Sequence, residues 1–383
     1  MTRTTVTMFL TALLAAGNVA FSQEAPATMD DAHRQAAQAL IAGGAKYLLS
    51  KQEADGAWSL NGSGKPALTA LALKAILQTP GYDLKTPAVQ NGLKALLSFR
   101  QKDGGIYTPA EGMFNYHNSI VIMCLSTVVK LDPQYKPILD EAVKYNRSLV
   151  IRPGDTAPKG EKIVKGEGDE GGVNYGKKGR ADLSNAAMWV EAMRQAGVAS
   201  DDADIQAVAG YVTRVQNNAE TNKRDLVIEG PNDGGFFYTY NESKGGDGPG
   251  SKGLRSYGSM TYSGFKSLLH AGLTKDDPRV RAAFTWIRQY WRLDCNPNLP
   301  ELQSQEGLYY YYHAFARALK VWNEPVIKDT KGADHNWRQE LIDALKERLS
   351  PDGSWVNAKA ARWDEGNPVL ATCFAVLALQ ETL

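Results

Sequence analysis

The sequence predicts an all-α fold, an α6/α6 toroid of six helical hairpin repeats, on three observations. Six short turns recur, each with an acidic residue followed by glycine. Each turn joins an amphipathic helical segment to one that is apolar on nearly all sides. No linker-like break separates the repeats, and stacked hairpins bury apolar faces that one hairpin leaves exposed. The turns are Asp55-Gly56-Ala57-Trp58, Asp103-Gly104-Gly105-Ile106, Glu170-Gly171-Gly172-Val173, Asp233-Gly234-Gly235-Phe236, Glu306-Gly307-Leu308-Tyr309 and Asp352-Gly353-Ser354-Trp355.

The apolar second helices are expected to form an inner ring around a central cavity, and the amphipathic first helices an outer ring. The expected inner helices are 66–77, 118–131, 183–196, 259–270, 310–322 and 368–380. The expected outer helices are 35–50, 87–99, 138–149, 202–215, 278–291 and 337–349. Three insertions, 152–168, 217–231 and the Gly-rich 241–254, interrupt the repeats. The Gly-rich segment is interpreted as a flexible surface loop. The alternative is a lid or a phosphate cradle, although the segment lacks the spacing of a P-loop.

The turn chemistry explains the recurring pair. An Asp or Glu side chain accepts backbone N–H groups at a tight turn, and glycine adopts the positive φ angles that other residues avoid. The aromatic or apolar residue that follows is expected to stack under the next unit.

Composition limits the function classes. The chain has 383 residues, 43% of them hydrophobic, and a net charge of +1, which indicates neither nucleic acid nor an anionic membrane surface as a partner. Residues 1–22 are interpreted as a secretory signal peptide, with Arg3, an apolar run over 8–16, and small residues at Ala20 and Ser22. The alternative is a membrane anchor, but the run is too short to span a bilayer. We expect an exported protein with no further membrane span, a disordered lead-in over 23–34, and the toroid over 35–383.

Three cysteines argue against a disulfide scaffold in a chain of this length. Cys124 and Cys373 fall in apolar helical segments and are expected to be buried, whereas Cys295 falls in a loop.

Two turns carry a longer pattern, Gln52-x-x-Asp55-Gly56-x-Trp58 and Gln303-x-x-Glu306-Gly307-x-Tyr309. This pattern resembles the repeat motif of squalene-hopene and oxidosqualene cyclases, which the β subunits of protein prenyltransferases carry in looser form. The resemblance covers about 35–383 and implies an α6/α6 toroid like one catalytic domain of a cyclase. The motif is structural in that family, so it implies fold rather than chemistry.

The resemblance also suggests a proton donor. Asp182-Leu183-Ser184-Asn185-Ala186-Ala187 aligns with the Asp-x-Asp-Asp-Thr-Ala segment of the cyclases. Ser184 replaces the proton donor and Asn185 its acidic neighbour, and a hydroxyl is too weak an acid to protonate an alkene. Asp182 remains as a candidate catalytic acid. The alternative is that Asp182 is the N-cap of the third inner helix.

A prenyltransferase-like zinc site is incomplete. Tyr311-Tyr312-His313 resembles the segment that supplies the zinc-binding His, with Tyr310 in place of its Asp. Ser259-Met260-Thr261 stands where the Asp-x-Cys ligands are expected. Because tetrahedral zinc needs three protein ligands or more, we expect neither a metal nor a cofactor.

Polar and aromatic side chains near the inner-helix starts supply the candidate site. His117, Asp182 and His313 are the catalytic candidates if they converge at one mouth of the cavity. The alternative for each His is a structural role. The ligand-binding candidates, which either line an apolar cavity or pack between units, are Tyr116, Ser184, Asn185, Tyr257, Thr261 and Tyr312.

Three function classes remain open. The first is an exported toroid that binds or transforms an isoprenoid or other apolar ligand. The second is a carbohydrate-active toroid, which needs two facing carboxylates; Asp182 and Glu365 are the ones near inner-helix starts. The third is a non-catalytic interaction module, without the Gly-Cys-Gly-Glu-Gln thioester segment.

Overall fold

The computed structural model describes residues 29–176 and 179–383, and these are mostly helical, as predicted. The expected signal peptide and residues 23–28 of the lead-in lie outside the described residues. Within the described ranges, no helix is both long and apolar enough to span a bilayer.

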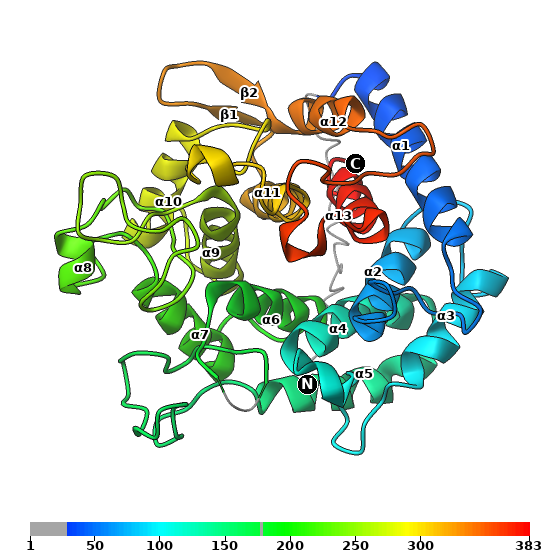
Figure 1. Ribbon diagram of the computed structural model, residues 1–383, viewed down its shortest axis with the longest axis horizontal. Coiled ribbons are helices and arrows are strands. Elements are labelled where there is room, and N and C mark those ends of the chain that lie inside the picture. Colours follow the sequence, from blue (N-terminus) through cyan, green and yellow to red (C-terminus); the bar gives the residue numbers. More distant parts are fainter. Residues whose placement is uncertain (1–28, 177–178) are drawn as a thin grey trace, which may run out of the picture.

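Six helices surround the centre of the molecule (Figure 1). Each contacts the next in chain order, and the last contacts the first, so the series closes on itself. These inner helices are α2 (Lys65–Leu77), α4 (Phe114–Leu131), α6 (Leu183–Gln195), α9 (Gly258–His270), α11 (Leu308–Trp322) and α13 (Pro368–Gln380).

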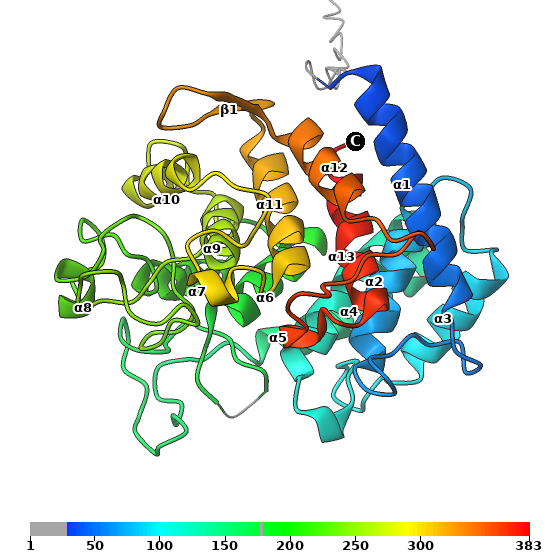
Figure 2. The ribbon, with the colours of Figure 1, turned by 45° about the horizontal axis from the view of Figure 1, so that its top comes forward.

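A second set of helices lies outside the first (Figures 1 and 2). Their apolar stripes pack inward, and their exposed faces carry the charged residues, as expected for amphipathic helices. The outer helices are α1 (Asp31–Ser50), α3 (Pro87–Leu97), α5 (Lys136–Arg147), α7 (Ala203–Arg214), α10 (Pro278–Gln289) and α12 (Trp337–Glu347).

The remaining elements are short. A two-stranded antiparallel hairpin, β1 (Val326–Lys328) and β2 (Asp334–Asn336), joins α11 to α12, so the expectation of an all-α chain misses one small sheet. The insertion at 217–231 contains the one-turn helix α8 (Asp225–Ile228). The 3₁₀ turns are η1 (Pro109–Glu111), η2 (Pro133–Tyr135), η3 (Glu301–Gln303) and η4 (Arg362–Asp364).

Several helices begin earlier than expected, α1 and α4 by four residues each. Asp30 accepts the His33 N–H at 2.8 Å and starts α1 at Asp31, so residues 31–34 of the expected lead-in are helical. Gly112, in the left-handed conformation, turns the chain into α4, which begins four residues before the expected start. A left-handed Gly307 does the same for α11.

The six repeated turns have the geometry that their residues predict. Their glycines, Gly56, Gly104, Gly171, Gly234, Gly307 and Gly353, all have φ between +64° and +87°. In four turns the aspartate accepts the N–H two residues on, at 3.0–3.1 Å.

The turns also make hydrogen bonds to neighbouring units. Gln52 Nε2 donates to Gly56 O within its own turn and to Ala88 O at the start of α3, at 2.9 and 2.8 Å. Gln216 makes the same two contacts in the fourth unit, with Gly234 O and Arg279 O. In these two units the glutamine therefore fixes the turn to the next outer helix, which is a structural role.

Cys124, Cys295 and Cys373 are free and buried, as predicted for the two helical ones.

Candidate functional site

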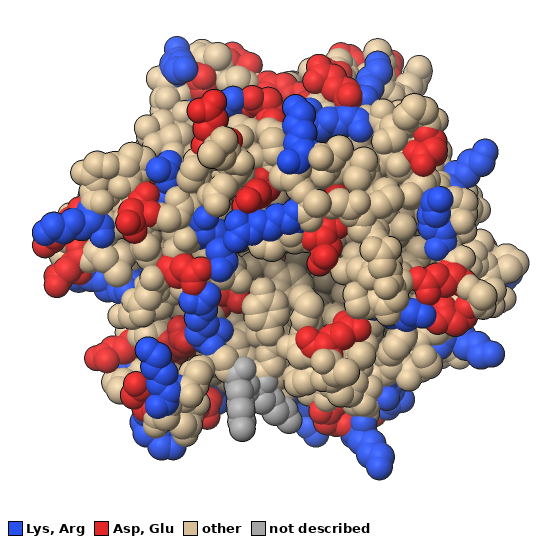
Figure 3. Space-filling model, in the orientation of Figure 1, with Lys and Arg blue, Asp and Glu red and all other residues tan. Residues whose placement is uncertain are grey.

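A cavity of about 240 Å³ opens where all six inner helices begin. Figure 3 shows the same face hollowed near its centre. Because the first turns of the six helices and the loops between them line one space, the inner helices run parallel with their N-termini at the mouth.

One side of the cavity is apolar. The first two turns of α2 and α4 present Leu68, Leu71 and Ile120, and α13 presents Leu370 and Phe374. Aliphatic surface of this kind binds hydrocarbon by excluding water.

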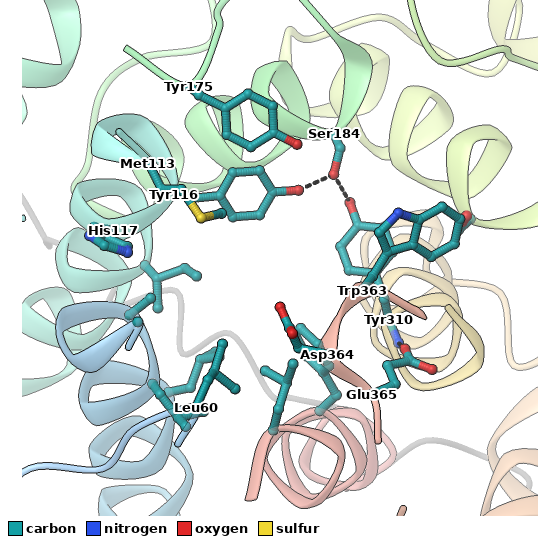
Figure 4. A pocket seen from close by; sticks show the side chains of 18 of the residues that line it. Leu60, Met113, Tyr116, His117, Tyr175, Ser184, Tyr310, Trp363, Asp364 and Glu365 are labelled. Atoms are coloured by element: carbon teal, nitrogen blue, oxygen red, sulfur yellow. Dashed lines mark hydrogen bonds between the residues drawn. The ribbon is translucent and has the colours of Figure 1, made fainter. Parts of the chain in front are cut away.

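The opposite side carries tyrosine hydroxyls (Figure 4). Ser184 Oγ lies between the hydroxyls of Tyr116 and Tyr310, in close contact with the first and 2.9 Å from the second. The Tyr116 ring stacks on Tyr175 with centroids 5.5 Å apart, and Tyr175 bonds the Tyr238 hydroxyl at 3.1 Å. Burial raises the pKa of Tyr116 well above its usual value, so this wall is uncharged but hydrogen-bonding.

Two consecutive acids enter the cavity from the loop before α13. Asp364 points into the space in Figure 4. Trp363 and Asp364 both have positive φ, 57° and 63°. This conformation is strained for a residue with a bulky side chain such as Trp363, and such strain clusters at active sites and ligand clamps.

Glu365 is buried at the start of α11. Its carboxylate accepts Tyr310 N–H and Asn357 Nδ2–H, both at 2.8 Å. It thereby supplies the cap that Gly307, which has no side chain, does not provide. Burial raises the pKa of Glu365 to about 7, although the backbone donors of α11 oppose the shift.

Of the predicted catalytic residues, only His117 lines the cavity. It lies in the first turn of α4, not before the helix as expected. Its Nδ1 accepts Thr108 N–H at 3.3 Å and its Nε2 contacts Glu111 at 3.2 Å, so it ties the loop to the helix. Burial lowers the pKa of His117 to about 4, which leaves the ring neutral.

Asp182 and Asn185 lie outside the cavity lining. Asp182 accepts Asn185 N–H and Nδ2–H, both at 2.8 Å, and is the N-cap of α6, which was the alternative interpretation. Burial raises the pKa of Asp182 to about 6. Asn115 Nδ2 donates to Asn185 Oδ1 at 2.8 Å and holds it in a buried network.

Some of the remaining candidates line the cavity, and the others make structural contacts around it. Tyr116, Ser184 and Tyr257 line the cavity. Thr261 Oγ1 accepts the Phe236 N–H at 3.1 Å, as Thr69 and Thr372 do for the turns of their own units, so it fastens a turn to an inner helix. Tyr312 donates to Leu293 O. The structure thus does not bring His117, Asp182 and His313 together.

His313 lies deeper, beside a buried charge network. Its ring packs 5.5 Å from Phe374, a cavity residue, and the nearby charges are Glu191, Lys266 and Arg317. Burial lowers the pKa of His313 to about 4. In the described ranges no group of three or more His, Cys, Asp or Glu side chains is arranged to hold a metal ion.

The network, which sequence reasoning missed, fills the interior below the cavity. Glu191 of α6 pairs with Lys266 of α9, and its second oxygen lies 2.6 Å from Arg317 Nε of α11. Arg317 also pairs with Glu381 at the end of α13. Burial alone would raise the pKa of Glu191, but the charges of Arg317 and Lys266 outweigh it and hold that pKa well below its usual value.

Lys74 of α2 reaches the same region. Its Nζ lies 3.3 Å from both Thr127 Oγ1 and Gln195 Oε1. Burial and the Arg317 charge lower the pKa of Lys74 to about 8. Polar side chains from opposite helices therefore meet at the centre of the ring. They confine the cavity to the end of the ring where the inner helices begin.

The buried acid predicts a pH dependence of stability. Between about pH 4.5 and 7 the folded state binds a proton at Glu365 that the unfolded state has released, so the Glu365 contribution to the free energy of unfolding falls as pH rises. This contribution amounts to about 3 kcal/mol across that window. The buried neutral histidines His117, His270 and His313 act in the opposite sense, because the unfolded state binds protons there that the folded state does not. The test is therefore the difference between two proteins: in urea unfolding at pH 4.5 to 8, the stability of the unmodified protein relative to Glu365→Gln should fall as pH rises. Parallel curves for the two proteins would contradict the assignment.

Comparison with known proteins shows the fold alone. No protein-family model and no curated protein matches the chain. A variant of the type II terpene cyclase MstE from Scytonema, solved with its substrate geranylgeranyl dihydroxybenzoate, is 14% identical; the match covers 92% of this chain and 98% of that one, with a TM-score of 0.54. An inactive variant of the α-1,6-mannanase GH76A of Salegentibacter sp. HEL1_6, solved with α-1,6-mannotriose, is 9% identical, with 90% and 99% covered and a TM-score of 0.56. A protein from Actinoplanes is 15% identical, with 90% and 99% covered and a TM-score of 0.52. The cyclase and the mannanase have α/α toroid folds, and the chain shares that general fold.

Proposed function

We propose that the chain is a six-hairpin α/α toroid that binds an apolar ligand of the isoprenoid class in the cavity at the inner-helix N-termini. The observation that carries the proposal is the lining: aliphatic side chains on one side and aromatic rings on the other, with few charges. The ligand that MstE binds, which carries a geranylgeranyl chain, supports the same class.

The volume limits how much of the ligand is enclosed. An apolar cavity of about 150 Å³ holds one benzene molecule. On that scale 240 Å³ encloses roughly ten carbon atoms, a ten-carbon isoprenoid or one end of a longer chain. The remainder of a longer ligand would leave through the open mouth.

The acid segment of the cyclases is absent, and the proposal is therefore binding rather than cyclisation. Ser184 bonds two tyrosines, and Asp182 is held as a helix cap outside the cavity. Neither is placed to protonate an alkene in the cavity.

A carbohydrate-active toroid is the second candidate, because two carboxyl groups and the exposed Trp363 lie at the mouth and the mannanase shares the fold. Glycoside hydrolysis needs two carboxyl groups on opposite sides of the scissile bond. Asp364 and Glu365 are consecutive, and both oxygens of Glu365 are engaged by Tyr310 and Asn357. The geometry favours the apolar ligand.

Mass spectrometry of an organic extract from the purified protein tests the class, with calorimetric titration of geraniol against α-1,6-mannotriose as the direct measurement. We expect a bound isoprenoid and geraniol binding. Ala67→Phe, which fills the cavity, should weaken geraniol at least tenfold with the fold intact by circular dichroism. The matched control, Ala199→Phe on an exposed loop, should bind normally. Binding of mannotriose without geraniol would overturn the proposal.

We also propose export, on the strength of residues 1–22. N-terminal sequencing of the mature protein from its native host should begin near Gln23, whereas a mature chain beginning at Met1 would contradict it.

A further inference from the structure

Charge at the cavity mouth is asymmetric. Lys244 is the one lysine or arginine in the described lining, and its Nζ lies 2.5 Å from Glu242. Glu242 also pairs with Arg180, and Arg362 pairs with Glu306 at 2.7 Å. These three positive charges are thus already matched by carboxylates.

Asp364 is in the opposite situation. Asp364 is exposed at the mouth, and within residues 29–176 and 179–383 its carboxylate has no hydrogen-bond or ion-pair partner. Figure 4 shows it directed toward the cavity. Glu365 beside it adds a second acidic group to the same wall.

The aromatic wall facing these acids accepts cations. Five tyrosines line the cavity: Tyr116, Tyr175, Tyr238, Tyr257 and Tyr310. The ammonium of Lys244 already lies over the Tyr238 ring, 4.7 Å from its centroid. The faces of tyrosine rings attract ammonium groups through their quadrupole, and more strongly when water is excluded.

We propose that the ligand carries a positively charged amine at one end of its apolar body, seated between the Asp364 carboxylate and the tyrosine rings. This inference rests on the proposed function and specifies the chemistry of the ligand's polar end. The ammonium donates hydrogen bonds to Asp364 and to the tyrosine and serine oxygens, while the hydrocarbon packs on α2, α4 and α13.

A ligand with a different polar end group would fit this cavity less well. A diphosphate would find no unpaired cation in the described lining and would face Asp364 at close range, a like-charge contact that disfavours binding. An alcohol can donate only one hydrogen bond and gains nothing from the carboxylate's charge or the ring faces.

Three ligands with the same ten-carbon tail test the inference by calorimetry at pH 7.5 without divalent metal: geranylamine, geraniol and geranyl diphosphate. We expect geranylamine to bind at least tenfold more tightly than geraniol, and the diphosphate at least tenfold more weakly. Equal affinity of amine and alcohol, or tightest binding of the diphosphate, would overturn the amine while leaving the apolar cavity intact. Binding of none of the three would overturn the proposed function as well.

Variants locate the contact. Asp364→Asn should reduce the affinity for geranylamine about tenfold and leave geraniol unchanged, because only the amine uses the charge. Asp140→Asn, an exposed acid on α5, is the matched control and should change neither. If Asp364→Asn still binds geranylamine as much more tightly than geraniol as the unmodified protein does, Asp364 is not the contact for the amine.

Discussion

Replacing Glu191 by alanine is expected to lower the free energy of unfolding by about 3–5 kcal/mol, as for other buried ion pairs that lose one partner. Glu191 is 1% exposed and holds both Lys266 and Arg317. Its loss leaves three cations, Lys74, Lys266 and Arg317, around the single carboxylate of Glu381. Urea unfolding at pH 7 measures the change.

The charge count predicts an asymmetry that distinguishes this explanation from simple loss of packing. Lys266→Met removes a cation and leaves two cations with two carboxylates, so it should cost less than half as much as Glu191→Ala. Asp140→Ala breaks an exposed pair with Lys136 on α5 and should change stability by less than about 0.5 kcal/mol. Equal costs for Glu191→Ala and Lys266→Met would show that charge balance does not govern the network.

The repeated turns were predictable because their chemistry is local. An aspartate, a glycine and an aromatic within four residues specify a tight turn whatever surrounds it, and the six glycines have the expected positive φ. Where an insertion separates the glutamine from the acidic residue of its turn, the repeat motif is no longer recognisable in the sequence. Gln216 makes the same contacts as Gln52, but it lies 17 positions before Asp233, whereas Gln52 lies three positions before Asp55.

The candidate site was only partly predictable. Tyr116, Ser184, Tyr257 and His117 follow from their places near the starts of inner helices. Asp364 comes from a loop whose path depends on left-handed backbone at two residues with side chains, for which the sequence carries no signal. His313 was misplaced because α11 begins at Leu308, two residues before the expected start, so His313 lies in the second turn of the helix.

The buried charge network could not be inferred from the sequence at all. Glu191, Lys266 and Arg317 are charged residues in three largely apolar helices, and each alone resembles an exposed position. They become partners only because α6, α9 and α11 face one another across the interior. Such pairing depends on the closure of the ring, not on any spacing along the chain.

The second large loss of stability is expected for Trp355→Ala, because Trp355 lies where the last unit of the ring meets the first. Trp355 is fully buried in the last turn, where Nε1 donates to Leu345 O at 2.7 Å and N–H donates to Thr372 Oγ1 at 3.0 Å. Its ring packs against Gly44 of α1, and an added Cβ at the neighbouring Gly353 would lie 3.3 Å from Gly43 O. The last unit is thus joined to the first, and the substitution should cost about 3–5 kcal/mol.

The location of the damage is the more specific measurement. Because the Trp355 ring supports α1, which is about 300 residues earlier in the sequence, amide hydrogen exchange should accelerate in residues 31–50 as well as in α12 and α13. Trp355→Phe keeps most of the ring and loses the indole donor, so it should cost about 1–2 kcal/mol and leave α1 largely protected. Unchanged protection of α1 in Trp355→Ala would mean that the first and last units do not depend on each other.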